Sequence, residues 1–229
     1  PYCDFNSHVR DSVNQDAWRD AMITELRWYA ERYNNGMRPV GRIGPSAQLP
    51  KLFGEREQSE QSLRETECFV AGQKNNTLKS IFFGGGTPSY FTEPQLERLL
   101  ARLNDITGFA SSATEVTAEC NPESLNLEKA QLMRSLGVNR LSVGVQSLNP
   151  VTLEFFERPH TPGQALAAVE AVKAAGYERW SADLIHGAPM ESPDDIRHNI
   201  LSVLDLGADH ISAYGLTYEP GTPLHARLE

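Results

Sequence analysis

The fold is decided by three segments within residues 140–187: RLSVGVQ (140–146), TPGQALAAVEAVKAAG (161–176) and WSADLIHG (180–187). The middle segment is typical of a helix that Thr161 caps, that has Pro162 at its first position and that ends at Gly176. The outer segments are short apolar runs, typical of buried strands. Two strands joined by a helix predict a strand–helix–strand unit, in which the strands lie parallel.

The same order recurs on both sides of this unit. Further apolar runs are SIFF (80–83), EVTAEC (115–120) and HISAYGLT (210–217), and helices are expected over 93–106, 127–136 and 193–206. The strand starts, near 80, 115, 141, 180 and 210, have the spacing of consecutive parallel units. The runs are interpreted as apolar on both faces, as in a parallel sheet covered on both sides. The sequence therefore predicts an α/β fold built from repeated strand–helix units.

The first part of the chain departs from the repeat. A helix is expected over residues 15–33, and the strand of its unit would lie before Pro1. Residues 34–77 are rich in glycine, proline and charge, so they are expected to form an irregular insertion. Cys68 lies inside that insertion and is not expected to be catalytic. The chain is thus read as one domain over residues 1–229, truncated at both ends.

Composition excludes several classes of protein. The chain has 229 residues, of which 40% are hydrophobic and 22% charged, as in a globular domain. A net charge of -9 argues against nucleic-acid binding, which needs a basic surface. No apolar run approaches the roughly 20 residues that span a bilayer. Three widely spaced cysteines predict no disulfide framework but a reducing compartment, and therefore a cytoplasmic protein.

Candidate site residues follow the strands, because parallel β/α folds bind ligands at the carboxyl ends of their strands. Each of them also has a structural explanation: a glycine run often marks a tight turn, and an arginine is often a surface charge. Asp183 is the hardest to explain structurally, because an unpaired carboxylate in an apolar strand is costly. The candidates in chain order are Gly84, Gly85, Gly86, Thr87, Glu119, Gln146, Arg158, Asp183 and Thr217.

The ordered set of motifs resembles a known family. The strings are CDFNSH, FFGGGTPS, EVTAECNPESL, GVNRLSVGVQSLN, RPHT, DLIHGAP and HISAYGLTYEPGTPL. In this order they are similar to radical S-adenosylmethionine (radical SAM) proteins of the HemN/HemW family. The resemblance implies a partial parallel (β/α)6 barrel, here without its first strand.

The opening residues PYCDFNSH then have an interpretation. The family binds a [4Fe–4S] cluster through a C-x-x-x-C-x-x-C loop, and Cys3 matches the last of its three ligands. Thiolate sulfur suits iron–sulfur chemistry. The other two cysteines would lie before Pro1, and Tyr2 and Phe5 flank the ligand as candidate cofactor-binding residues.

The resemblance also implies an S-adenosylmethionine site. Gly85, Gly86 and Thr87 would border the methionine part of this cofactor, and Thr217 would lie at the end of the fifth strand. The remaining positions that match cofactor contacts in the family are Glu119, Gln146, Arg158 and Asp183. An arginine suits a carboxylate, and acids suit an ammonium, a sulfonium or ribose hydroxyls.

Phe5 indicates the branch of the family. The coproporphyrinogen dehydrogenases have a further cysteine two residues after the third ligand, where this chain has Phe5. The resemblance therefore implies a heme chaperone that carries heme to heme-accepting proteins such as respiratory enzymes. Two alternatives stay open: an oxygen-independent coproporphyrinogen III oxidase, and a barrel remnant that binds no cofactor.

Overall fold

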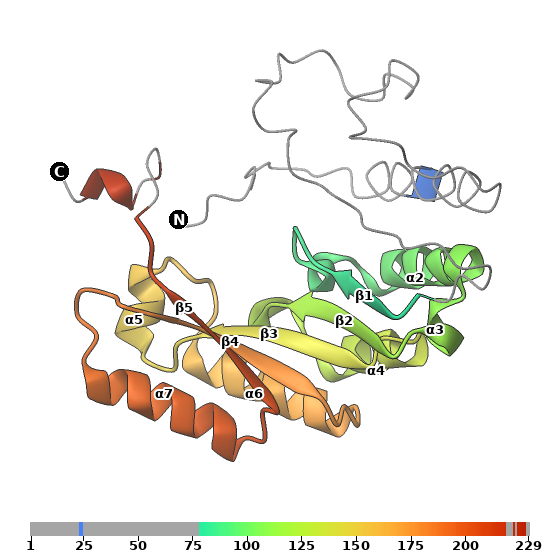
Figure 1. Ribbon diagram of the computed structural model, residues 1–229. Helices are drawn as coiled ribbons and strands as arrows, with labels where there is room; N and C mark the ends of the chain where they lie inside the picture. Colours follow the sequence, from blue (N-terminus) through green and yellow to red (C-terminus); the bar gives the residue numbers. More distant parts are fainter. Residues whose placement is uncertain (1–22, 25–77, 219–221, 223, 228–229) are drawn as a thin grey trace, which may run out of the picture.

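The computed structural model describes residues 23–24, 78–218, 222 and 224–227 (Figure 1). The predicted insertion at 34–77 and the candidate residues Tyr2, Cys3 and Phe5 lie outside this part. Of the predicted helix over 15–33, only Ile23 and Thr24 are described, and both are helical.

Five parallel strands form one sheet, as the sequence predicts. They are β1 (Ser80–Phe83), β2 (Glu115–Cys120), β3 (Arg140–Gln146), β4 (Trp180–His186) and β5 (His210–Gly215). Their order across the sheet is β1-β2-β3-β4-β5, so each strand lies beside its neighbour in the chain. A parallel sheet that grows by one strand at a time in one direction is the arrangement of a β/α barrel wall, and all carboxyl ends meet at one rim (Figure 1).

Four longer helices connect the strands: α2 (Glu93–Thr107), α4 (Leu127–Ser135), α6 (Pro162–Ala174) and α7 (Pro193–Asp205). Capping boxes begin α2, α6 and α7, at Thr92, Thr161 and Ser192. These match the predicted starts. The structure adds short elements that the sequence does not predict: α3 (Phe109–Ser112), α5 (Pro150–Phe155), η1 (Pro88–Tyr90), η2 (Pro122–Ser124) and η3 (His225–Arg227). No helix in the described part is long and apolar enough to cross a bilayer.

The helices pack on one face of the sheet and enclose the core with it (Figure 1). Leu96 of α2, Met133 of α4, Val172 of α6 and Val203 of α7 are each at most 1% exposed. The strands contribute alternate residues to the same core, among them Val116, Ala118, Leu141, Val143, Trp180 and Ala182. This alternation fixes which side chains are left for the other face.

The other face carries mostly polar side chains, with Phe82 and Ile185 as apolar exceptions, so the expectation of strands that are apolar on both faces is wrong. Register pairs Thr117 with Arg140 and Glu119 with Ser142, Ser142 with Ser181, and Asp183 with Ser212. Several of these side chains are nevertheless buried, such as Ser142 at 8% and Ser181 at 2% exposed. They can be buried because they hydrogen-bond one another, which offsets the loss of water. One face of the sheet thus makes the core, and the other carries polar groups.

Candidate functional site

The loop after β1 brings backbone to the rim of the sheet. Gly85 has φ of 99°, a left-handed conformation that glycine adopts without strain. A Cβ on Gly84 would lie 3.0 Å from Cδ of Glu119, whereas no atom of the described residues lies within 4 Å of a Cβ on Gly85 or Gly86. The glycine run therefore packs closely against Glu119 at one end, and at the other end the described residues leave space beside the backbone.

Glu119 and Asp183 are two carboxylates on the polar face. Burial raises the pKa of the Glu119 carboxyl, the charge of Asp183 raises it further, and a backbone hydrogen bond from Gly85 opposes both. Burial also raises the pKa of Asp183. Each carboxylate is partly removed from water, and the charge of Asp183 acts on Glu119. The polar face beside these two carboxylates therefore favours a cationic ligand.

Serine hydroxyls hold Asp183 in place. Oγ of Ser142 donates to the carboxylate at 2.8 and 3.0 Å, and it lies 2.8 Å from Oγ of Ser181. A hydrogen bond with Ser212 of β5 acts on the same carboxylate and lowers its pKa, against the effect of burial. The cost of burying the Asp183 carboxylate is thus offset by hydroxyl partners from the two neighbouring strands, Ser142 on β3 and Ser212 on β5.

A second group of polar side chains joins the loops after β1, β2 and β3. Nδ2 of Asn121 donates to Oγ1 of Thr87 at 3.1 Å. A Cβ on Gly144 would lie 2.7 Å from Nε2 of Gln146 and 3.0 Å from Oδ1 of Asn121. The missing side chain at Gly144 therefore makes room for both amides. Asn121 and Gly144 were not predicted as site residues, although Asn121 lies in the quoted string EVTAECNPESL.

Backbone strain marks two positions at the rim. In the described part, the non-glycine residues with positive φ are Gln146 (62°) and Glu157 (54°). Gln146 is a predicted site residue, and Glu157 directly precedes another, Arg158. Strained residues cluster at functional sites, because only a constrained surrounding keeps them. Burial lowers the pKa of the Arg158 guanidinium to about 10, a value at which it keeps its charge at neutral pH.

Behind the rim, a buried histidine joins three loops. Nε2 of His160 lies 3.1 Å from the carbonyl oxygen of Val145, and Nδ1 lies 3.3 Å from Oε2 of Glu123. The hydroxyl of Tyr90 donates to Oε1 of Glu123. His160 is 3% exposed whereas Tyr90 is 48% exposed, so the set connects η1, η2 and the end of β3 from the surface to the protein interior. We call Tyr90, Glu123 and His160 the rim knot.

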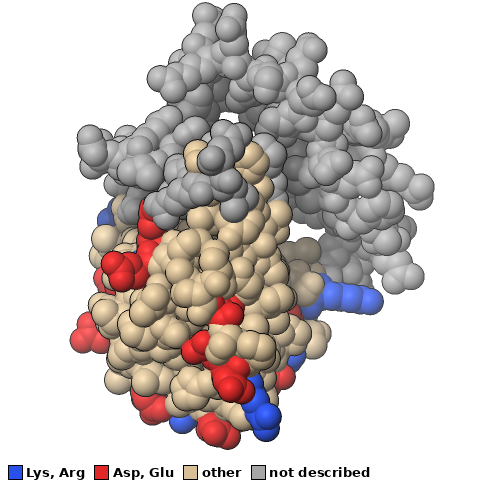
Figure 2. Space-filling model, turned by 90° about the vertical axis from the view of Figure 1, so that its left-hand side faces the viewer, with Lys and Arg blue, Asp and Glu red and all other residues tan. Residues whose placement is uncertain are grey.

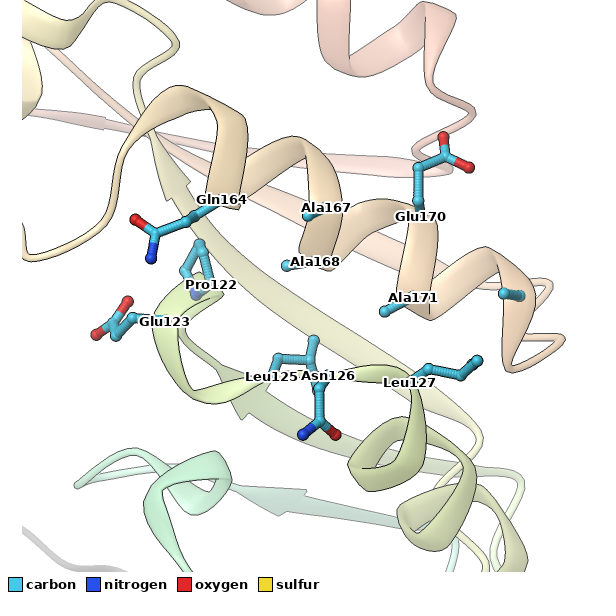
Figure 3. A pocket seen from close by; sticks show the side chains of 11 residues that line it. Pro122, Glu123, Leu125, Asn126, Leu127, Gln164, Ala167, Ala168, Glu170 and Ala171 are labelled. Carbon is cyan, nitrogen blue, oxygen red and sulfur yellow. The ribbon is translucent and has the colours of Figure 1, made fainter.

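A cavity of about 520 Å³ lies on the helix side of the sheet rather than at the rim. It is an open groove between η2, the start of α4 and α6 (Figure 3). Figure 3 shows Pro122, Leu125 and Ala168 along its floor, with Glu123 and Gln164 at one end. The groove is mostly apolar and holds none of the predicted cofactor residues, so we do not place the cofactor there.

The predicted residues do not all meet. Contacts or electrostatic effects connect Gly85 with Glu119, Glu119 with Asp183, and Thr87 with Asn121. Thr217 is exposed after the end of β5, where its hydroxyl lies 3.4 Å from the carbonyl oxygen of Gly215. Gly85, Thr87, Glu119 and Gln146 thus lie at the carboxyl ends of their strands, with Asp183 beside Glu119 on the polar face and Thr217 at the margin.

Comparison with known proteins identifies the family. Residues 1–202 match the Radical SAM superfamily. The chain belongs to this superfamily. It is 38% identical over 152 residues to "Heme chaperone HemW" of Bacillus subtilis (strain 168), covering 66% of this chain and 40% of that protein. It is 28% identical over 228 residues to "Heme chaperone HemW" of Escherichia coli (strain K12), covering 99% of this chain and 50% of that protein.

Solved structures support the fold. A structure of coproporphyrinogen III oxidase (HemN) from Escherichia coli, described as a radical SAM enzyme, matches with a TM-score of 0.69 at 23% identity. The match covers 96% of this chain and 41% of that one. An archaeal Elp3 from Methanocaldococcus infernus matches with a TM-score of 0.55, over 67% of this chain and 40% of that one, at 19% identity. This radical SAM chain spans about half the length or less of the curated relatives named above.

Membership implies a [4Fe–4S] cluster and S-adenosylmethionine, and the described residues fit the latter. The cofactor carries a cationic ammonium and sulfonium and an anionic carboxylate. The chain offers carboxylates at Glu119 and Asp183 and a partly buried guanidinium at Arg158. The described residues contain no group of three or more His, Cys, Asp or Glu side chains that could hold a metal ion. The expected cluster ligand, Cys3, lies outside that part.

Proposed function

We propose that this chain is the radical SAM core of a heme chaperone, which binds a [4Fe–4S] cluster, S-adenosylmethionine and heme and delivers heme to other proteins. The observation that carries the proposal is the similarity to proteins named "Heme chaperone HemW", at 38% identity for the Bacillus subtilis relative. Phe5 supports it, because it stands where the resemblance places a cysteine in the porphyrin dehydrogenases. Phenylalanine cannot replace a thiol as a ligand.

Each of the site residues would bind a different part of the cofactor. Arg158 would bind the carboxylate of S-adenosylmethionine, and Glu119 and Asp183 would bind its cationic groups or ribose hydroxyls. Gln146 would donate or accept through its amide, and Gly85, Gly86 and Thr87 would border the methionine part. Cys3 would ligate the cluster, with Tyr2 and Phe5 beside it. When bound, the cluster supplies an electron for cleavage of the sulfonium.

The test uses the full-length protein under anaerobic conditions with reconstituted cluster. We expect it to bind heme in an absorption titration and to leave coproporphyrinogen III unchanged when reductant and S-adenosylmethionine are added. Porphyrins are separated by chromatography after incubation. Catalytic formation of protoporphyrinogen would overturn the chaperone proposal and establish coproporphyrinogen III oxidase activity, the alternative that the fold of HemN also fits.

A third outcome would support the remaining alternative, a barrel that binds no cofactor. A full-length protein that binds neither S-adenosylmethionine nor heme would be a barrel remnant without cofactor. Glu119→Ala and Asp183→Ala test this at the site: each should weaken S-adenosylmethionine binding by about 1–3 kcal/mol, the cost of leaving polar groups without a partner.

We further propose a cytoplasmic protein whose partners are heme-accepting proteins and not nucleic acids. The widely spaced cysteines support a reducing compartment. Figure 2 shows acidic side chains spread over the described part of one face, with basic ones at its margins. Together with a net charge of -9, this surface is unsuited to a polyanion. Failure to retain the protein on a nucleic-acid column at low salt is the expected result.

A further inference from the structure

Gln146 has a conformation that its own sequence does not favour. Its φ is 62°, in the left-handed region, where a side chain with a Cβ costs roughly 1–2 kcal/mol. The amide N–H of Ser147 donates to the carbonyl oxygen of Val145 at 2.7 Å and closes a three-residue turn around Gln146. The register between β3 and β4 shifts at the same place, between Val143 and Gln146. Some other part of the molecule must hold this turn.

Asn199 of α7, 53 residues after Gln146 in the chain, fixes this turn through hydrogen bonds. Its Oδ1 accepts the amide N–H of Leu148 at 2.9 Å, and its Nδ2 donates to Oγ of Ser147 at 3.1 Å. Asn199 is 3% exposed and Ser147 is fully buried, so the bond between their side chains is shielded from water, whereas the bond to the Leu148 amide is partly buried. The oxygen and the nitrogen of the Asn199 side-chain amide thus both bond to the two residues that directly follow Gln146.

Neighbouring bonds strengthen the same junction. The amide N–H of Asn149 donates to Oγ of Ser147 at 3.1 Å, and Nδ2 of Asn149 donates to Oδ1 of Asp195 in the first turn of α7 at 3.2 Å. The turn around Gln146 is therefore fixed to α7 by side chains from both segments. Truncating Asn199 leaves the Leu148 amide N–H without this acceptor and removes the hydrogen bond between Asn199 and Ser147, which favours relaxation of the turn.

We propose that Asn199 is a positioning residue for the cofactor site: through Ser147 and Leu148 it keeps Gln146 in the left-handed conformation that directs its amide toward Asn121 at the rim. This inference rests on the proposed function, because it assigns Gln146 to S-adenosylmethionine. The conformation of Gln146 at the rim would then depend on a residue of α7, on the helix side of the sheet.

The primary experiment measures S-adenosylmethionine binding by calorimetry in the full-length protein with reconstituted cluster. Asn199→Ala should weaken binding about tenfold. Asn139→Ala is the matched control: Oδ1 of Asn139 accepts the N–H of Val116 at 2.8 Å and its Nδ2 donates to Thr114 at 3.2 Å, at the opposite end of the strands. That variant also loses two hydrogen bonds but should bind with unchanged affinity.

A double-mutant cycle distinguishes positioning from general loosening. In a Gln146→Ala background, Asn199→Ala should change the affinity less than twofold, because the group on which it acts is already gone. Ser147→Ala, a smaller change, should reproduce the effect of Asn199→Ala if that variant folds poorly. Faster hydrogen exchange at the Leu148 amide should accompany both.

The outcomes separate the two proposals. A wild-type protein that does not bind S-adenosylmethionine overturns the proposed function and this inference with it. A wild-type protein that binds, with unchanged affinity in both Asn199→Ala and Ser147→Ala, overturns the inference alone. So does a tenfold loss that recurs in full in the Gln146→Ala background.

Discussion

Gln146 is a residue at which glycine should be better tolerated than alanine. Its φ of 62° favours glycine, which adopts this region without strain. Gln146→Gly should therefore be about 1 kcal/mol more stable than Gln146→Ala in urea denaturation. Glu170, exposed within α6, is the control at which the order should reverse, since alanine is the better helix former. Equal stabilities of the two variants at position 146 would contradict the strained conformation.

Glu119 and Asp183 should titrate as neighbours. Because the charge of Asp183 raises the pKa of Glu119, Asp183→Asn should lower it. The measurement is the carboxyl carbon shift of Glu119 in an NMR pH titration. An unchanged pKa of Glu119 in Asp183→Asn would show that the two groups do not interact. Asp105→Asn, an exposed change on α2, is the control and should leave the pKa of Glu119 unchanged.

The same shifts predict how stability depends on pH. Both carboxyls have a pKa raised on folding, so the native state holds their protons more tightly than the unfolded chain. The stability that they contribute is complete below their ordinary values of 3.8 and 4.5 and is lost as the pH rises through the folded values. Asp183→Asn should reduce this loss, measured as the difference in unfolding free energy between pH 4 and pH 7. If the unfolding free energies of Asp183→Asn at pH 4 and pH 7 differed by as much as those of the wild type, this prediction would be wrong.

At the scale of the elements, the rim knot should be a major source of local stability. His160→Ala removes a buried partner of Glu123 and of the Val145 carbonyl, so we expect a loss of about 1–3 kcal/mol in urea denaturation. His198→Ala, an exposed change on α7, should cost less than about 0.5 kcal/mol. Adding Glu123→Ala to His160→Ala should cost less than the sum of the two single changes. Full additivity would mean that the two side chains act independently.

The repeat of strands and helices could be predicted because its signals are local. Thr161, Pro162 and Gly176 define the limits of α6 within one segment, and the structure agrees. The short helix α5 was missed because six residues are too few for a helical period to be read. The polar face was misread because small serines such as Ser142 do not interrupt an apolar run. Asn199 could not be predicted at all, since nothing in the sequence pairs it with Ser147.

At the scale of the whole molecule, the cysteines should differ in their relation to the cluster. In the full-length protein, Cys3→Ala should abolish the roughly four irons per protein and the visible absorption obtained on reconstitution. Cys120→Ala should retain both, because Cys120 is buried and its pKa is raised to about 12, which disfavours the thiolate that iron needs. Full iron content in Cys3→Ala would contradict the assignment of the cluster loop.

The two faces of the sheet also bear on how such a protein can change during evolution. On the helix side, substitutions are limited by volume, because side chains such as Trp180 and Val143 are fully enclosed. On the other side, the limits are hydrogen bonds among small polar groups such as Ser142 and Ser181. Since the faces alternate along every strand, selection can remodel one without disturbing the other. We therefore expect substitutions on the polar face to change what binds there while the packing that keeps the domain folded is inherited.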